Sequence, residues 1–227
     1  MMETLARKAT LEIYTKSKRS IKASKKLVQE WLGHEKFEYG TKEKKNQVGV
    51  VTGLAYTAFG GDILQIEVNY FEGKGKLIIT GQLGDVMKES AEIALDYVKS
   101  NAKKFGIDVK FFETHDIHIH VPEGAVPKDG PSAGVTLTTA FVSALTNKAV
   151  DANCAMTGEV TLRGNVLPIG GLREKSIAAN RSGITKVFIP KGNVKDIDEL
   201  PDIVKENITF MPVDKVDTIL KEAIIHD

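Results

Sequence analysis

The pattern of apolar residues changes abruptly at Gln47, and this change constrains the fold more than any other feature of the chain. Beyond it, short runs with alternating apolar and polar residues are interspersed with longer runs at helical spacing. The clearest strand is DIHIHV (116–121), whose three apolar side chains share one face while His118 and His120 share the other. Because strands and helices are mixed without a strict βαβ repeat, the sequence predicts an α+β fold.

Two kinds of element are expected after this change of pattern. Strands are predicted over residues 48–54, 62–71, 77–79, 116–121, 155–166, 186–190 and 208–213. Helices are predicted over residues 86–105, 132–145, 171–182 and 214–225. The Gly-rich segment EGKGK (72–76) predicts a β-hairpin between the strands that flank it.

The first 46 residues differ in charge from the rest of the chain. They hold 12 Lys and Arg against 6 Asp and Glu, whereas the net charge of the whole chain is +1. Residues 4–32 carry two apolar stripes at helical spacing, and the polar residues 39–46 are typical of a linker. A solvated helix face is the simplest interpretation of the basic residues, since no aromatic interleaving supports base stacking. We therefore expect no nucleic-acid partner for this chain.

Composition excludes several classes of protein. The chain is 42% apolar and 27% charged, which is ordinary for a globular protein and unlike a disordered tail or a fibre. No run approaches the roughly 18 apolar residues of a membrane span, so no membrane partner is expected. The N-terminus has no apolar core of a signal peptide, and the single Cys154 cannot form an internal disulfide. Together these features favour a cytoplasmic protein.

Neither a nucleotide nor a metal is expected in this chain. The segment GGLREKS (170–176) ends in Lys-Ser, but Glu174 stands where a phosphate-binding loop needs glycine. His118 and His120, with Asp116 nearby, resemble part of a zinc site, yet no further Cys or His cluster supplies the remaining ligands. Polar residues on a half-exposed strand or at a subunit contact are the simpler interpretation of these histidines.

Nucleophilic catalysis by Ser132 is a stronger hypothesis. This serine follows Asp-Gly-Pro at a predicted helix start, where unpaired N–H groups stabilise an oxyanion. Serine is also a common helix cap, so its position alone does not identify a nucleophile. Lys175 lies among apolar residues of another predicted helix, where desolvation would lower its pKa and make it a base, although a surface lysine is the simpler interpretation. A Ser-His-Asp triad finds no support in the sequence.

Several ordered motifs resemble one enzyme family. The segment PKDGPSAG (127–134) is similar to the serine signature of the Lon family of ATP-dependent proteases. Three further segments are similar to the lysine signature of that family: MTGE (156–159), LRG (162–164) and LPIGGLREK (167–175). Upstream, VTGLA (51–55), Gly60-Gly61 and GKGK (73–76) are similar to the start of its proteolytic domain. The resemblance covers most of the chain and implies a serine peptidase.

The resemblance implies roles for three side chains. Ser132 matches the nucleophile of the family, and Lys175 matches its general base. Thr157 matches a residue whose hydroxyl orients the lysine amine.

Four further residues are expected near the site by the same resemblance. Asp129 and Gly130, together with Ser132, would supply backbone amides for the oxyanion, and the Asp-Gly-Pro stretch has an active and an inactive form in the family. Glu67 and His118 are expected close by, where a structural role is an equal alternative.

The resemblance also implies a domain organisation. Residues 1–38 would be a helical remnant of the α-subdomain of an ATPase module, residues 39–46 a linker, and residues 47–227 the proteolytic domain of a bacterial-type Lon. ATP and Mg²⁺ would then be needed only by the ATPase module missing from this chain. The full-length enzyme would be a hexameric ring for protein quality control.

The sequence thus predicts a serine endopeptidase domain with a Ser-Lys dyad. It would cleave unfolded or damaged proteins and peptides, with ATP dependence only in the full-length hexamer. One alternative is a catalytically silent protein- or DNA-binding assembly domain of the same fold. A metal-dependent hydrolase built around His118 and His120 is a more distant alternative.

Overall fold

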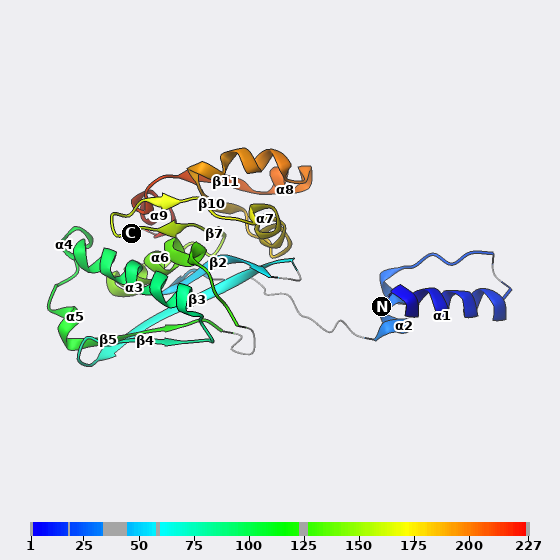
Figure 1. Ribbon diagram of the computed structural model, residues 1–227, viewed down its shortest axis with the longest axis horizontal. Coiled ribbons are helices and arrows are strands. Elements are labelled where there is room, and N and C mark those ends of the chain that lie inside the picture. Colours follow the sequence, from blue (N-terminus) through cyan, green and yellow to red (C-terminus); the bar gives the residue numbers. More distant parts are fainter. Residues whose placement is uncertain (1, 18, 34–44, 58–59, 123–126, 226–227) are drawn as a thin grey trace. The chain divides into compact units, whose positions relative to one another are not determined.

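The chain forms two compact units, residues 1–39 and 40–227. The computed structural model describes residues 2–17, 19–33, 45–57, 60–122 and 127–225 (Figure 1). The predicted linker at 39–46 lies almost entirely outside the described residues, which resume at Lys45.

The N-terminal unit contains two helices where one helical stretch was expected. α1 spans Met2–Thr15 and α2 spans Lys25–Leu32. The second helix begins separately because Ser24 caps it, its Oγ accepting a hydrogen bond from the Leu27 N–H at 3.2 Å. Lys8 Nζ donates to Trp31 O at 2.6 Å and so joins the two helices. Neither helix has a buried residue.

A seven-stranded mixed sheet forms the centre of the second unit, in the order β11-β10-β7-β2-β3-β5-β4. Its strands are β2 (Val50–Thr57), β3 (Gly60–Glu72), β4 (Leu77–Thr80), β5 (His115–His120), β7 (Cys154–Met156), β10 (Lys186–Pro190) and β11 (Thr209–Val213). β11, β10, β7 and β2 run parallel, β3 is antiparallel to β2 and β5, and β4 is parallel to β5. Two short antiparallel pairs lie outside this sheet: β1 (Gln47–Val48) with β6 (Ala149–Val150), and β8 (Glu159–Val160) with β9 (Val166–Leu167).

Helices cover both faces of the sheet. They are α3 (Asp85–Ser100), α4 (Ala102–Phe105), α5 (Phe111–Thr114), α6 (Gly134–Thr146), α7 (Leu172–Arg181), α8 (Asp202–Asn207) and α9 (Val216–Ala223), with 3₁₀ turns η1 (Pro131–Ala133) and η2 (Lys191–Glu199). Strand β10 shows the two faces: Phe188 packs in the core with α3, α6 and α9, whereas Val187 and Ile189 pack in a second core with α7 and α8. The mixed sheet and its helices confirm the expected class of fold.

The predicted hairpin across residues 72–76 is wrong. Strand β5 lies between β3 and β4, so the two strands that flank the turn do not pair with each other. The turn is held instead by Asp116, whose Oδ1 accepts hydrogen bonds from the N–H groups of Lys74 at 2.7 Å and Lys76 at 2.9 Å. Glycines mark a turn locally, but a strand from far along the chain decides which strands pair.

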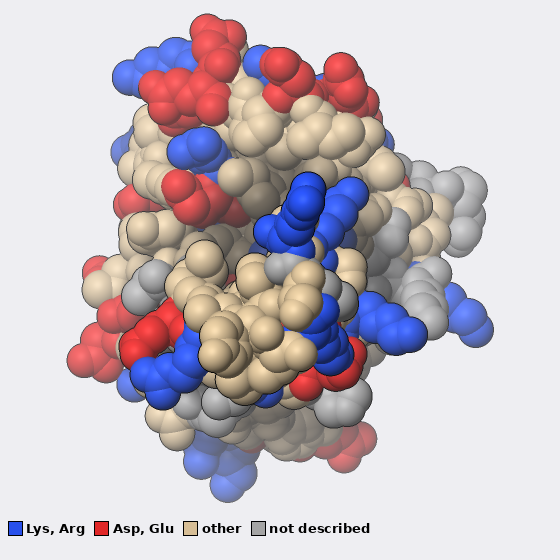
Figure 2. Space-filling view, turned by 90° about the vertical axis from the view of Figure 1, so that its right-hand side faces the viewer, with Lys and Arg blue, Asp and Glu red and all other residues tan. Residues whose placement is uncertain are grey.

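Charged residues are spread over the surface of the second unit. Figure 2 shows acidic side chains gathered along its upper edge, where η2 and α8 lie. Asp198, Glu199, Asp202 and Glu206 are exposed on these two elements. None of the helices in the described part of the chain is long and apolar enough to cross a membrane.

Candidate active site

Ser132 lies in the 3₁₀ turn η1, which leads directly into α6. The helix expected to begin at Ser132 therefore begins as a 3₁₀ turn, and the serine side chain is half-buried. The backbone of Ser132 is fixed by the segment after β7, because the Gly158 N–H donates to Ser132 O at 2.8 Å. A second hydrogen bond between the same two segments runs from the Val135 N–H to Gly158 O at 3.1 Å.

Lys175 lies in the first turn of α7 and is 2% exposed. This helix packs closely on β3, because a Cβ on Gly61 would collide with the carbonyl group of Glu174. Close packing excludes water from the lysine, and burial lowers the pKa of its amine to about 8. A substantial fraction of Lys175 is therefore neutral near pH 8 and able to accept a proton.

The structure brings Ser132, Lys175 and Thr157 together. Lys175 Nζ lies 2.9 Å from Ser132 Oγ and donates to Thr157 Oγ1 at 3.0 Å. The buried Thr157 hydroxyl donates its single hydrogen to Ser132 O at 3.3 Å. It can therefore only accept from the amine, so one lysine N–H is committed to Thr157. In the neutral amine the lone pair is then left for the hydroxyl hydrogen of Ser132.

Asp129 is held at the start of α3. Its Oδ1 accepts hydrogen bonds from the N–H groups of Met87 at 3.0 Å and Gly130 at 2.9 Å. Gly84 allows this approach, because a Cβ there would collide with the Asp129 carboxylate. Two of the predicted loop residues thus fix the loop itself.

Not every amide expected for the oxyanion is free to bind one. The Gly130 N–H already donates to the Asp129 carboxylate. The amide of Ser132 lies in the first turn of η1, where backbone N–H groups have no partner within the helix. Ser132 is therefore the better placed of these two amides to bind an oxyanion.

The reactive groups open onto a hollow of about 540 Å³. Strands β2 and β3, the loop 127–131 and residues 168–171 enclose it. Much of its wall is apolar, contributed by Leu54, Ala55, Ile63, Leu64, Met87, Pro131 and Ala133. Such a wall suits the side chains of a peptide substrate.

Glu67 and His118 lie away from this hollow. Both line a separate hollow of about 790 Å³, together with His120 and Tyr70. The Thr80 hydroxyl lies between the two imidazoles, 2.9 Å from His118 Nε2 and 2.8 Å from His120 Nδ1. These contacts indicate a structural network between β4 and β5. In the described ranges, no group of three or more His, Cys, Asp or Glu is placed to hold a metal ion.

One part of the site was missed in the sequence: the role of Gly84 and Met87 in holding Asp129. A signal for it exists, since a helix beginning at Asp85 leaves unpaired N–H groups that favour an acidic partner. Nothing in the sequence indicates that this partner comes from the serine loop, because 42 residues separate Met87 from Asp129.

The comparison with known families decides the identity of the chain. Residues 22–226 match the C-terminal proteolytic domain of Lon protease (S16). The chain belongs to the Lon protease family. The resemblance drawn from its motifs is thereby confirmed.

Individual Lon proteases are similar over almost all of this chain. It is 53% identical to Lon protease 1 of Bacillus subtilis (strain 168) over 224 residues, which cover 99% of the chain and 29% of that protein. It is 56% identical to Lon protease of Mycoplasma mycoides subsp. mycoides SC over 218 residues, or 96% of the chain and 27% of that protein. Lon protease 1 of Myxococcus xanthus is 53% identical over 219 residues, with 96% of the chain and 27% of the relative covered. The chain spans less than a third of the length of these relatives.

Proposed function

We propose that this Lon domain is a serine endopeptidase in which Ser132 is the nucleophile and Lys175 the general base. The observation that carries the proposal is the 2.9 Å separation of Lys175 Nζ and Ser132 Oγ at a buried position. A base must lie within hydrogen-bond reach of the proton it removes, and its pKa must lie near the working pH. The pKa of about 8 supports the second requirement.

The proposed reaction is an acyl transfer in two halves. Neutral Lys175 accepts the proton of the Ser132 hydroxyl while Oγ forms a bond to the scissile carbonyl carbon. The Ser132 N–H and the N-terminal end of the η1–α6 helical segment stabilise the oxyanion. Protonated Lys175 then gives its proton to the leaving amine nitrogen as the C–N bond breaks. In the second half Lys175 removes a proton from water, whose oxygen bonds to the ester carbonyl carbon. Protonated Lys175 then returns this proton to Ser132 Oγ as the ester C–O bond breaks, which releases the acid product and restores the neutral amine.

Thr157 has a positioning role in this proposal. Its hydroxyl accepts from Lys175 and donates to Ser132 O, so it ties the base to the backbone of the nucleophile. This arrangement limits rotation of the amine and directs its lone pair at the serine.

The proposed substrates are peptides and unfolded or damaged proteins, because an extended chain can enter a hollow of this size and bring a peptide bond to Ser132. We propose that the chain needs no cofactor for peptide cleavage. ATP dependence, Mg²⁺, hexamer formation and a cytoplasmic role in protein quality control are proposed for the full-length enzyme.

Hydrolysis of an unstructured fluorogenic peptide tests the dyad. We expect Ser132→Ala and Lys175→Ala each to reduce kcat/KM by at least 10³-fold, while Ser100→Ala and Lys99→Ala, exposed at the end of α3, leave it unchanged. Undiminished activity in either dyad variant would overturn the proposal. Activity that a chelator abolishes would favour a metal-dependent hydrolase instead.

A covalent serine-directed probe supplies a second test. We expect it to label Ser132 in the wild-type protein and to leave the Ser132→Ala variant unlabelled. A folded wild-type protein that is neither labelled nor active would instead be a silent assembly domain.

A further inference from the structure

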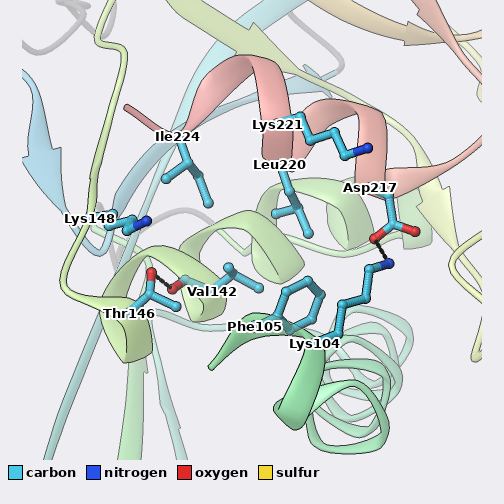
Figure 3. A pocket seen from close by; sticks show the side chains of 9 residues that line it. All are labelled: Lys104, Phe105, Val142, Thr146, Lys148, Asp217, Leu220, Lys221 and Ile224. Atoms are coloured by element: carbon cyan, nitrogen blue, oxygen red, sulfur yellow. Dashed lines mark hydrogen bonds and ion pairs between the residues drawn. The ribbon is translucent and has the colours of Figure 1, made fainter. Parts of the chain in front are cut away.

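A small hollow of about 240 Å³ lies at the far end of α6 from Ser132. It is enclosed by the end of α4, the C-terminal part of α6 and helix α9 (Figure 3). It shares no lining residue with the hollow that contains Ser132 and Lys175. Any ligand of this hollow is therefore separate from the proposed peptide substrate.

The floor of the hollow is apolar. Phe105, Val142 and Leu220 come from three different helices, Ile224 directly follows α9, and all four point toward the centre of the hollow (Figure 3). Val142, Leu220 and Ile224 are buried residues of the main core, and Phe105 packs against that core. An apolar group that entered the hollow would displace water from this apolar floor, which is favourable.

The rim of the hollow is basic. Lys104, Lys148 and Lys221 line it, and Asp217 is the one acidic residue among the described residues of its lining. Asp217 is already satisfied, because its Oδ1 accepts from Lys104 Nζ at 2.6 Å and from the Tyr97 hydroxyl at 3.0 Å. Lys221 also interacts electrostatically with Asp217, so among the described residues that line the hollow Lys148 is the lysine without a compensating carboxylate.

Lys148 stands apart from the Asp217 pair. Figure 3 shows it on the opposite side of the hollow from Lys104 and Asp217, beyond the apolar floor. Its ammonium group makes no hydrogen bond or ion pair with any described residue. A ligand that covers the floor would thus meet an unpaired cation at this end.

We propose that this hollow binds an apolar carboxylate, with its apolar body on the floor and its carboxylate paired with Lys148. The volume of about 240 Å³ suits one group of the size of a phenyl or isobutyl side chain, and it is too small for a nucleotide or a helix. The same chemistry is offered by a free small acid and by the C-terminal residue of a polypeptide.

Titration with N-acetyl-L-phenylalanine, followed by NMR chemical shifts, tests the site. The matched probe is N-acetyl-L-phenylalaninamide, which has the same apolar body and no charge. We expect saturable shifts of the amides of Phe105 and Leu220 with the acid, and at least fivefold weaker binding of the amide. Equal binding of the two probes, or no saturable shift with the acid up to 10 mM, would overturn the proposal.

Two variants locate the binding. Lys148→Gln changes an exposed side chain and is expected to weaken the binding of N-acetyl-L-phenylalanine at least fivefold. Lys99→Gln, on the exposed surface of α3, is expected to leave this binding unchanged. Thr146→Phe fills the hollow from its rim and is expected to abolish binding in a protein whose thermal unfolding shows that it is folded. Binding that survives in both Lys148→Gln and Thr146→Phe contradicts the assigned position.

A tetrapeptide ending in phenylalanine, Gly-Gly-Gly-Phe with a free carboxyl group, distinguishes the two sources. Binding of the peptide together with N-acetyl-L-phenylalanine assigns the hollow to a chain terminus. Binding of N-acetyl-L-phenylalanine alone assigns it to a small acid.

Discussion

Lys175 Nζ donates a hydrogen bond to Thr157 Oγ1 at 3.0 Å, and both side chains are buried. Thr157 reaches this position because its backbone N–H donates to Phe188 O at 3.1 Å, which ties it to the neighbouring strand β10. The Lys175 amine is thus connected to the central sheet through Thr157. This relationship leads to the first prediction.

Replacing Thr157 with valine removes the hydroxyl and keeps the shape of the side chain. We expect kcat/KM for a peptide to fall about 10- to 100-fold, because the amine loses the partner that directs its lone pair at Ser132. The base limb of the pH–rate profile moves to lower pH, since losing an acceptor disfavours the charged amine. Thr157→Ser retains the hydroxyl and should restore most of the activity. Unchanged kinetics in Thr157→Val would show that the hydroxyl does not position the base.

The rate of peptide cleavage should follow the deprotonation of Lys175. Burial lowers the pKa of this amine to about 8, and only the neutral form accepts the serine proton. We therefore expect kcat/KM to rise with pH through about 8 and to level off above it, with roughly one hundredth of the plateau at pH 6. Steady-state kinetics between pH 6 and 10 measure this limb. A limb at the ordinary lysine value would mean that the amine is not desolvated when it reacts.

The same burial makes Lys175 a cost to stability at neutral pH. The folded-state pKa is about 8 and the ordinary value is 10.5, so between these pH values the unfolded state binds more protons and the free energy of unfolding rises with pH. A difference of this size corresponds to about 3 kcal/mol. The variant Lys175→Met removes this cost but also loses the hydrogen bonds to Ser132 and Thr157, which cancels roughly half of the gain in stability.

We accordingly expect Lys175→Met to be about 1–2 kcal/mol more stable than the wild type at pH 7. The wild type should gain about 3 kcal/mol relative to this variant as the pH rises to 10.5 and above, where the lysine becomes neutral in both states, so that the wild type becomes the more stable protein by about 1–2 kcal/mol. Urea unfolding at several pH values measures the difference, and Lys191→Met, an exposed lysine of η2, controls for a change of charge alone. A stability difference that does not vary with pH would contradict this account.

The sequence predicted the central elements of the site because their signals are local. Apolar runs marked β2, β3 and β10, and glycines marked the ends of α4 and α7. The motifs around Ser132 and Lys175 indicated the roles of these two residues, although only the fold brings residues 43 positions apart to within 2.9 Å.

What the sequence did not predict depends on contacts between distant segments. β5 inserts beside β3 because both strands bury apolar faces in one sheet, and no turn residue near 72–76 records that pairing. Glu67 and His118 were expected near the dyad but line a separate hollow, and the reason is related. β3 is 13 residues long, so its two ends contribute to different hollows. Position on a strand near the site does not establish which end faces it.

Gly84 should be a sensitive position for activity, although it lies 48 residues before Ser132 in the chain. A Cβ at Gly84 would collide with the Asp129 carboxylate, so this carboxylate would lose its hydrogen bond to the Met87 N–H. The loop that carries Asp129 and leads to Ser132 would then shift. We expect Gly84→Ala to lower kcat/KM at least tenfold while the free energy of unfolding falls by only about 1 kcal/mol, the order of one helix-capping contact. Gly170→Ala is the matched control, because Gly170 lines the same hollow and has open space around its Cβ position. Equal activities of the two variants would show that the position of Asp129 does not govern the nucleophile loop.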